Sequence, residues 1–83
     1  MHDRDQKWAR GAARPSPTPA ELLGRRISAL RSDAGLSQEK VFLAADIPRA
    51  TYQRIEMGRA DVRYSQLIRI AAVLHCHVRE LLP

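Results

Sequence analysis

Residues 36–58 read LSQEKVFLAADIPRATYQRIEMG and contain two short helical patterns separated by a tight corner. Ser37 can cap a helix that begins at Gln38, because its hydroxyl can accept a hydrogen bond from a free amide of the first turn. Apolar residues then recur at helical spacing, and this first helix should end near Asp46.

The second helical pattern begins after the corner, in which Ile47 is expected to be buried. Pro48 suits a first helical turn, because its backbone angle is already helical and it has no amide that needs a partner. The helix should therefore run from Pro48 to about Met57, and Gly58 should end it.

This second helix has a packing side and a polar side. The packing side carries Thr51, Tyr52 and Ile55, and the polar side carries Arg49, Ala50, Gln53 and Arg54. Arginine can make paired hydrogen bonds to guanine in the DNA major groove, glutamine can do so to adenine, and an alanine methyl can contact a thymine methyl. Polar residues on an arbitrary helix usually only face solvent. The surrounding sequence must therefore indicate whether these side chains contact DNA bases or are simply solvated.

The rest of the chain also has helical periodicity, in segments of about residues 20–34 and 65–74. The expected core residues of these segments are Leu23, Ile27, Leu30, Ala34, Leu67, Ile70, Ala71 and Leu74, with Val78, Leu81 and Leu82 closing the domain. No strand-like alternation stands out between them, so the sequence predicts an all-α domain.

Length and composition indicate one small binding module. The chain has 83 residues, and a domain of about 60 residues buries only about 60% of its unfolded surface, which leaves little room for a deep substrate pocket. The sequence has no glycine-rich phosphate loop and no nucleophile with an orienting histidine and acid. We therefore predict a protein that is not an enzyme.

The chain is basic, with a formal net charge of +5. This charge gives a long-range attraction for polyanions, but ribosomal binding, an acidic protein or an anionic membrane could also use it, and so could a basic surface without a partner. Arg59 and Arg63 flank the loop after the second helix, and Lys40 and Arg49 lie near the other edge of the motif. Asp61 weakens the positive field in that loop.

Residues 1–20 differ in character from the rest, because three prolines alternate with small residues and favour an extended segment. We predict a flexible, mildly basic tail over residues 1–20 and a folded domain over residues 21–83. The tail could follow DNA phosphates or enter a minor groove, or Trp8 could dock on the domain or on a second subunit. It lacks the apolar core of a signal peptide, and no later stretch is long enough to cross a membrane, so we expect a cytoplasmic protein.

From residue 20 onward the chain resembles a known family. The residues that carry the resemblance are Arg31, Gly35, Leu36, Ser37, Gln38, Glu39, Thr51, Arg54, Ile55, Glu56, Gly58, Leu67, Arg69, Ile70, Ala71, Leu74, Glu80, Leu81 and Leu82. In type and spacing they are similar to the Xre helix-turn-helix family, which includes the lambda repressor and Cro. The resemblance implies a lambda-repressor-like, all-α bundle of about five helices, in which the second and third form a helix-turn-helix and the third lies in the DNA major groove.

The resemblance also implies roles for individual residues. Those that match base-facing positions are Arg49, Ala50, Gln53 and Arg54. Those expected to contact the DNA backbone are Gln38, Lys40, Thr51, Arg59 and Arg63. Gln38 would also brace the reading helix. Arg31 and Glu56 match a largely buried ion pair that ties the first helix to the end of the third.

Three residues depart from the family pattern. Phe42 stands where the family usually has alanine, so its ring must either turn outward or push the two helices of the motif apart. Asp46 stands where a glycine commonly takes a left-handed backbone conformation, which aspartate tolerates at some cost. Pro48 replaces the usual capping serine or threonine, so the first amides of the reading helix need another partner.

The single cysteine lies in the tripeptide His75-Cys76-His77, whose side chains are all possible metal ligands. Three consecutive residues rarely converge on one ion, and the third histidine, His2, belongs to the tail. The resemblance implies a short turn here, with glycine in place of His75 and a buried aliphatic residue in place of Cys76. We therefore predict a core cysteine, no metal and no cofactor.

These observations predict a transcriptional regulator, specifically a repressor, that binds double-stranded DNA at a palindromic operator as a symmetric homodimer in the nucleoid. The dimer follows from the resemblance, and its candidate contact residues are Leu43, Val62, Val78, Leu82 and the turn 75–77. An alternative is an antitoxin that neutralises a toxin protein and regulates its own promoter. A third option, which Phe42 suggests, is a scaffold whose motif meets another protein instead of DNA.

Overall fold

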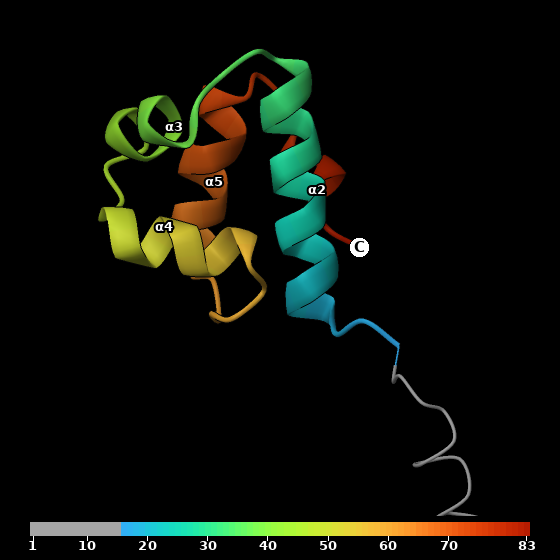
Figure 1. Ribbon diagram of the computed structural model, residues 1–83. Helices are drawn as coiled ribbons and strands as arrows, with labels where there is room; N and C mark the ends of the chain where they lie inside the picture. Colours follow the sequence, from blue (N-terminus) through green and yellow to red (C-terminus); the bar gives the residue numbers. More distant parts are fainter. Residues whose placement is uncertain (1–15) are drawn as a thin grey trace, which may run out of the picture.

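The computed structural model describes residues 16–83, which form a helical bundle (Figure 1). The elements are the α-helices α2 (Pro19–Asp33), α3 (Gln38–Ala44), α4 (Arg49–Glu56) and α5 (Tyr64–Val73), followed by the 3-10 helix η1 (Val78–Glu80). The predicted all-α class is confirmed. The expected count of about five helices is slightly off for the described residues, because the last segment forms a single 3-10 turn and not another α-helix.

The helices enclose one core. In Figure 1, α2 stands along one side, α5 runs behind the middle of the bundle, and α3 and α4 occupy the other side with α4 passing below α3. The buried apolar residues are Leu23, Ile27, Val41, Phe42, Ala45, Ile47, Tyr52, Ile55, Leu67, Ile70, Ala71, Leu74 and Leu81. Two residues expected in the core are exposed instead: Ala34, which caps the end of α2, and Leu82, which follows the fully buried Leu81 and is 49% exposed.

Helix α2 begins with a reciprocal cap. The Thr18 hydroxyl accepts a hydrogen bond from the Glu21 amide at 3.1 Å, and the Glu21 carboxylate accepts one from the Thr18 amide at 2.9 Å. Pro19 is the first helical residue, where the missing amide costs nothing. Pro19 and Ala20, which the sequence placed in the tail, therefore belong to α2, and residues 1–15 of that predicted tail lie outside the described residues.

The corner between α3 and α4 follows the expected local signals. The Ser37 hydroxyl accepts a hydrogen bond from the Lys40 amide at 3.0 Å. Asp46 has a left-handed backbone, with φ of 59°, and the next residue, Ile47, is buried. Pro48 precedes α4 as its N-cap and makes no side-chain cap bond, so α4 starts at Arg49, one residue later than predicted.

Phe42 does not turn outward. Its side chain is only 6% exposed and lies in the junction between α3 and α4, where its ring centroid is 6.2 Å from that of Tyr52 and the two rings are tilted by 48°. This offset, tilted arrangement is a favourable geometry for an aromatic pair. Phe42 is therefore a core residue that joins the two helices of the motif.

In the turn after α5, His75 stands where the family pattern has glycine. His75 has a left-handed backbone, with φ of 57°, and Cys76 is partly buried against the core. Burial, followed by the charge of Glu80, raises the pKa of the Cys76 thiol above its ordinary value. Among residues 16–83, no three His, Cys, Asp or Glu side chains are grouped closely enough to hold a metal ion. No helix of this part of the chain has the length and apolar character needed to cross a membrane.

Candidate nucleic-acid interface

Helix α4 has one buried and one accessible side. Tyr52 and Ile55 have almost no solvent exposure. On the accessible side, Arg49, Ala50 and Arg54 are exposed and Gln53 is half-buried. The predicted reading residues thus lie on one side of a helix whose other side belongs to the core, and their contact with bases stays a prediction.

The end of α4 is anchored by a cluster of hydrogen bonds around the Glu56 carboxylate. Arg31 donates from Nε to Oε2 at 2.7 Å and from Nη2 to Oε1 at 3.1 Å. Gln38 donates from Nε2 to Oε1 at 3.0 Å, and the Tyr52 hydroxyl donates to Oε2. The ion pair is largely shielded from solvent, with 16% of the Arg31 side chain and 6% of the Glu56 side chain exposed. Because these donors come from α2, α3 and α4, the cluster fixes the three helices relative to one another.

Two members of this cluster differ from the sequence expectation. Tyr52 was expected only to pack, although it precedes Glu56 by four residues and such a spacing places two side chains on the same helix face. Gln38 was expected to touch the DNA backbone and to brace the reading helix. The structure places its amide nitrogen on Glu56, so the bracing contact is made within the protein.

The cluster holds Glu56 in its charged form. Burial by itself would raise the pKa of the Glu56 carboxyl, but the hydrogen bonds from Arg31, Tyr52 and Gln38 outweigh burial and leave the pKa below its ordinary value. The hydrogen bond to Glu56 raises the pKa of Arg31. Burial, and then the hydrogen bond to Glu56, raise the pKa of the Tyr52 hydroxyl. At neutral pH the cluster therefore contains an anionic carboxylate, a cationic guanidinium and a neutral phenol that donates.

We expect part of the domain's stability to be lost in acid through Glu56. Because the pKa of Glu56 is lower in the folded chain, its contribution to the free energy of unfolding is complete above the ordinary value of 4.5 and is lost as the pH falls through the folded value. Urea unfolding followed by circular dichroism at a series of pH values should show this loss. Glu56→Gln replaces the carboxyl with an amide that does not titrate, so this variant should lack this part of the pH dependence. Equal pH dependence of the two proteins would show that Glu56 is not responsible for the loss.

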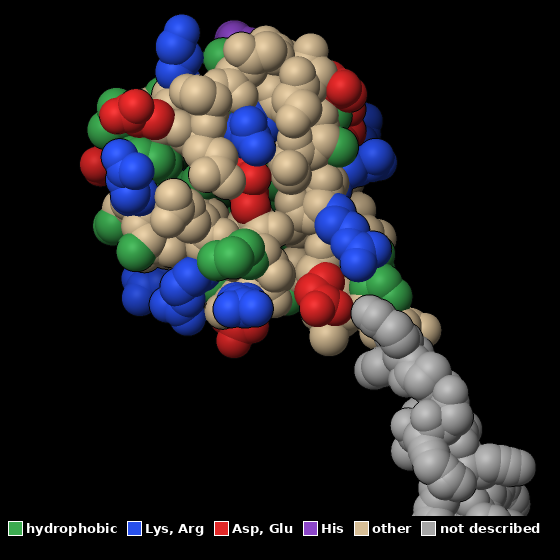
Figure 2. Space-filling model, in the orientation of Figure 1, with side chains coloured by type: hydrophobic (Ala, Val, Ile, Leu, Met, Phe, Trp, Pro, Cys, Tyr) green, Lys and Arg blue, Asp and Glu red, His purple; other side chains and the backbone are tan. Residues whose placement is uncertain are grey.

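The loop that follows α4 carries further basic residues. Arg54 donates from Nη2 to the carbonyl oxygen of Arg59 at 3.3 Å, which ties the end of the reading side to this loop. Arg59 and Arg63 are exposed, and Asp61 lies between them in the sequence. Figure 2 shows basic side chains along the lower edge of the molecule, beneath α4 and this loop, with an acidic group among them. Arg54 keeps its remaining donors available, since only one of its nitrogens bonds to Arg59.

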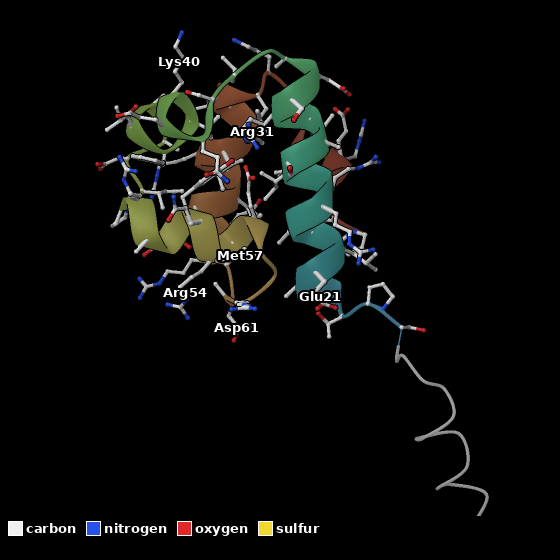
Figure 3. All side chains as sticks on the ribbon, in the orientation of Figure 1. Glu21, Arg31, Lys40, Arg54, Met57 and Asp61 are labelled. Atoms are coloured by element: carbon white, nitrogen blue, oxygen red, sulfur yellow. The ribbon has the colours of Figure 1, made fainter. Side chains whose placement is uncertain are left out.

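Lys40 lies apart from Arg54 and from the loop that follows α4. In Figure 3, Lys40 projects from α3 at the opposite end of the view from Arg54 and Asp61. Thr51, also predicted to touch the DNA backbone, is half-buried on α4. The structure therefore brings Arg54 and Arg59 together and leaves Lys40 apart from them.

Two residues without a predicted role set the position of α4. Arg69 on α5 donates from Nε to the carbonyl oxygen of Ala45 at 2.7 Å and so fixes the end of α3, just before the corner. Gly24 on α2 lies against the backbone of α4: a Cβ atom there would be 2.5 Å from the carbonyl oxygen of Glu56 and 2.6 Å from that of Ile55. A glycine within a helix predicts only a weaker helix, so this close approach had no signal in the sequence.

Two helices joined by a tight corner, the second with a polar side facing solvent, define a helix-turn-helix protein. The chain belongs to the helix-turn-helix domain family, whose model matches residues 22–82. The resemblance to the Xre group, inferred from the sequence, is confirmed by this match and by the structural neighbours.

Several solved structures are similar to this chain. The restriction-modification controller protein C.AhdI from Aeromonas hydrophila is 28% identical, with a TM-score of 0.74 over 76% of this chain and 96% of that chain. The clp gene regulator ClgR from Corynebacterium glutamicum is 24% identical, with a TM-score of 0.77 over 81% of this chain and 71% of that one. The hypothetical transcription factor NHTF from Neisseria is 23% identical, with a TM-score of 0.76 over 87% of this chain and 84% of that chain. The last two show a shared fold. Sequence comparison with curated proteins found no significant match.

Proposed function

We propose that the protein is a sequence-specific DNA-binding regulator of transcription, acting as a repressor, that reads the major groove with α4. The observation that carries the proposal is the division of α4 into two sides. Its inner side is fixed by buried Tyr52 and Ile55 and by the Glu56 cluster, while Arg49 and Arg54 remain exposed on the outer side. Base reading requires donors that point outward from a helix held in a fixed position. Groups that must first be ordered on binding cost free energy and so lower the affinity for DNA.

The chemistry of the outer side suits base edges. Arg49 and Arg54 can each pair with the two acceptors of guanine, and Gln53 can pair with adenine. Ala50 has a short side chain between them, which lets the helix approach and can contact a thymine methyl. The net charge of +5 supplies an attraction for DNA that does not depend on base sequence.

The DNA backbone would be held mainly at the edge of α4 and in the loop that follows it. Arg59 and Arg63 are exposed there, and Arg54 is hydrogen-bonded to this loop. Contacts of this kind set the register of a protein on DNA without carrying sequence information. Thr51 and Gln38 are the remaining candidates on this side, Gln38 through the part of its amide that Glu56 does not occupy.

We further propose that two copies bind as a symmetric dimer, with half-sites about one helical turn apart. Leu43, Tyr64, Ile68 and Leu82 are exposed apolar side chains on the described surface, and some of this area would be covered in a dimer. The regulatory role is supported by the names of similar structures, a restriction-modification controller and a clp gene regulator.

The proposal predicts two classes of substitution. Gln53→Ala or Arg54→Ala should weaken binding to a preferred duplex by about 1–3 kcal/mol and relax base preference, because each removes contacts to base edges. Arg59→Ala or Arg63→Ala should weaken binding to all duplexes and lower the salt slope by about 1, because each removes a phosphate contact. Selection from a random duplex pool, followed by anisotropy titrations at several salt concentrations, measures both effects.

The matched control is Arg25→Ala, since Arg25 is exposed on α2 and has no role in the proposed interface. This variant should retain the base preference of the wild type. If the wild-type protein selects no sequence from the pool, or if both classes of substitution have one small effect on every duplex, the proposed function is wrong.

A further inference from the structure

Arg49 stands over an aromatic ring at the start of the proposed reading helix. It is the first residue of α4, and its guanidinium carbon lies 5.3 Å from the centroid of the Phe42 ring on α3. A cation at this distance from a ring face is attracted by the ring's electron density. Among residues 16–83, no other polar contact engages the Arg49 side chain.

The ring itself is held in place. Phe42 is 6% exposed and packs against the Tyr52 ring, and the Tyr52 hydroxyl donates to Glu56. A chain of contacts therefore runs from the Glu56 cluster through Tyr52 and Phe42 to Arg49. An arginine attached to a fixed platform samples fewer rotamers than one in open solvent, so less entropy is lost when it binds.

This contact leaves the arginine able to recognise DNA. A guanidinium attracts a ring through its flat face, whereas its hydrogen-bond donors point outward in its own plane. Arg49 can therefore remain against Phe42 and still present paired donors to the two acceptors of a guanine. An alanine at position 42, which the family pattern usually has, would offer no such platform.

We propose that Phe42 is a positioning residue for DNA recognition, which orients the Arg49 guanidinium toward one base pair at the edge of each half-site. The inference rests on the proposed function and makes Phe42 partly responsible for the DNA sequence that the protein prefers. It predicts energetic coupling between Phe42 and Arg49 in DNA binding, and no such coupling between Phe42 and Arg54, because the contact with Phe42 is made by Arg49.

The test is a pair of double-mutant cycles on the duplex that the wild type prefers. Phe42→Leu and Arg49→Ala should be coupled by about two- to fivefold in Kd, the size of a cation–π contact at an exposed site. Phe42→Leu and Arg54→Ala should combine additively. Base by base, Phe42→Leu should relax preference at the position that Arg49→Ala relaxes. Phe42→Tyr, which keeps the ring face, should restore the preference and the coupling.

A second readout needs no DNA. In the free protein, the δ-methylene protons of Arg49 should have upfield chemical shifts from the Phe42 ring current, and these shifts should vanish in Phe42→Leu, while those of Arg54 stay unchanged. Thermal unfolding of each variant reports whether the core survives the substitution, and the Arg49 shifts in the wild-type protein test the contact even where Phe42→Leu unfolds.

The outcomes separate the two proposals. Absence of the ring-current shift, or equal coupling of Phe42 to Arg49 and Arg54, overturns the role of Phe42 while leaving sequence-specific binding intact. A wild-type protein that shows the shift but selects no sequence overturns the proposed function, and with it the role of Phe42 in recognition. Selective coupling to Arg49 with relaxed preference at one base pair supports the inference.

Discussion

Arg31→Met is expected to lower the free energy of unfolding by about 3–5 kcal/mol at neutral pH. Methionine keeps the unbranched stem and the helix preference of the arginine side chain, but it leaves the Glu56 carboxylate without its counter-charge at a site where 6% of the Glu56 side chain is exposed. The hydrogen bonds from Tyr52 and Gln38 remain and place the expected loss toward the lower end of this range. Chemical denaturation followed by circular dichroism measures the change.

The matched control for this prediction is Arg25→Met, a change of the same chemistry at an exposed position of the same helix. It should alter stability by no more than about 0.5 kcal/mol. Adding Glu56→Gln to Arg31→Met should restore part of the lost stability, because a neutral amide is less costly to bury than an unpaired carboxylate. A loss in Arg31→Met no larger than in Arg25→Met would show that the ion pair does not hold the helices together.

Gly24→Ala is expected to lower the free energy of unfolding by about 1–3 kcal/mol. The added Cβ would lie 2.5 Å from the carbonyl oxygen of Glu56 and 2.6 Å from that of Ile55, and backbone atoms cannot turn aside as a side chain can. Helices α2 and α4 must therefore separate. Because α4 moves with this change, we also expect the affinity for the preferred duplex to fall more than the affinity for an arbitrary one. Denaturation and anisotropy titration measure the two effects.

The expected loss of stability in Gly24→Ala is opposite in sign to the effect that helix preference alone would give. In a helix without close neighbours, alanine is more favourable than glycine by about 1 kcal/mol. Ala29→Gly, at an exposed position of α2, supplies the control and should destabilise by about that amount through helix preference alone. If Gly24→Ala stabilises the domain, the close approach of α2 and α4 is not tight in solution.

The helices were predictable from the sequence because their signals are local. Predicted starts and ends differ by one residue from the observed bounds of α2, α4 and α5. The serine cap of α3 and the left-handed Asp46 were also expected from their neighbours. The same periodicity placed Tyr52 and Ile55 on the packing side of α4. Such signals act within one or two turns of chain, so a single sequence displays them fully.

Other features were beyond the sequence because they depend on where separate helices meet. The ring of Phe42 was expected either to point outward or to push the two helices of the motif apart; it does not point outward, and it lies at the α3–α4 junction beside Tyr52 and under Arg49. The Arg31 and Glu56 pairing was available only through the resemblance to a family.

By itself the sequence determined four helices in the described part of the chain, the corner between α3 and α4, and the polar side that α4 turns to solvent. Only the tertiary structure decided that Gly24 lets α4 pack closely against α2, that Arg31 and Gln38 reach Glu56 from two other helices, and that Phe42 supports Arg49. The physical reason is the distance along the chain over which each interaction acts. Caps and periodicity stabilise a helix through neighbours a few residues away, whereas these contacts join residues on different helices and exist only once the helices have packed.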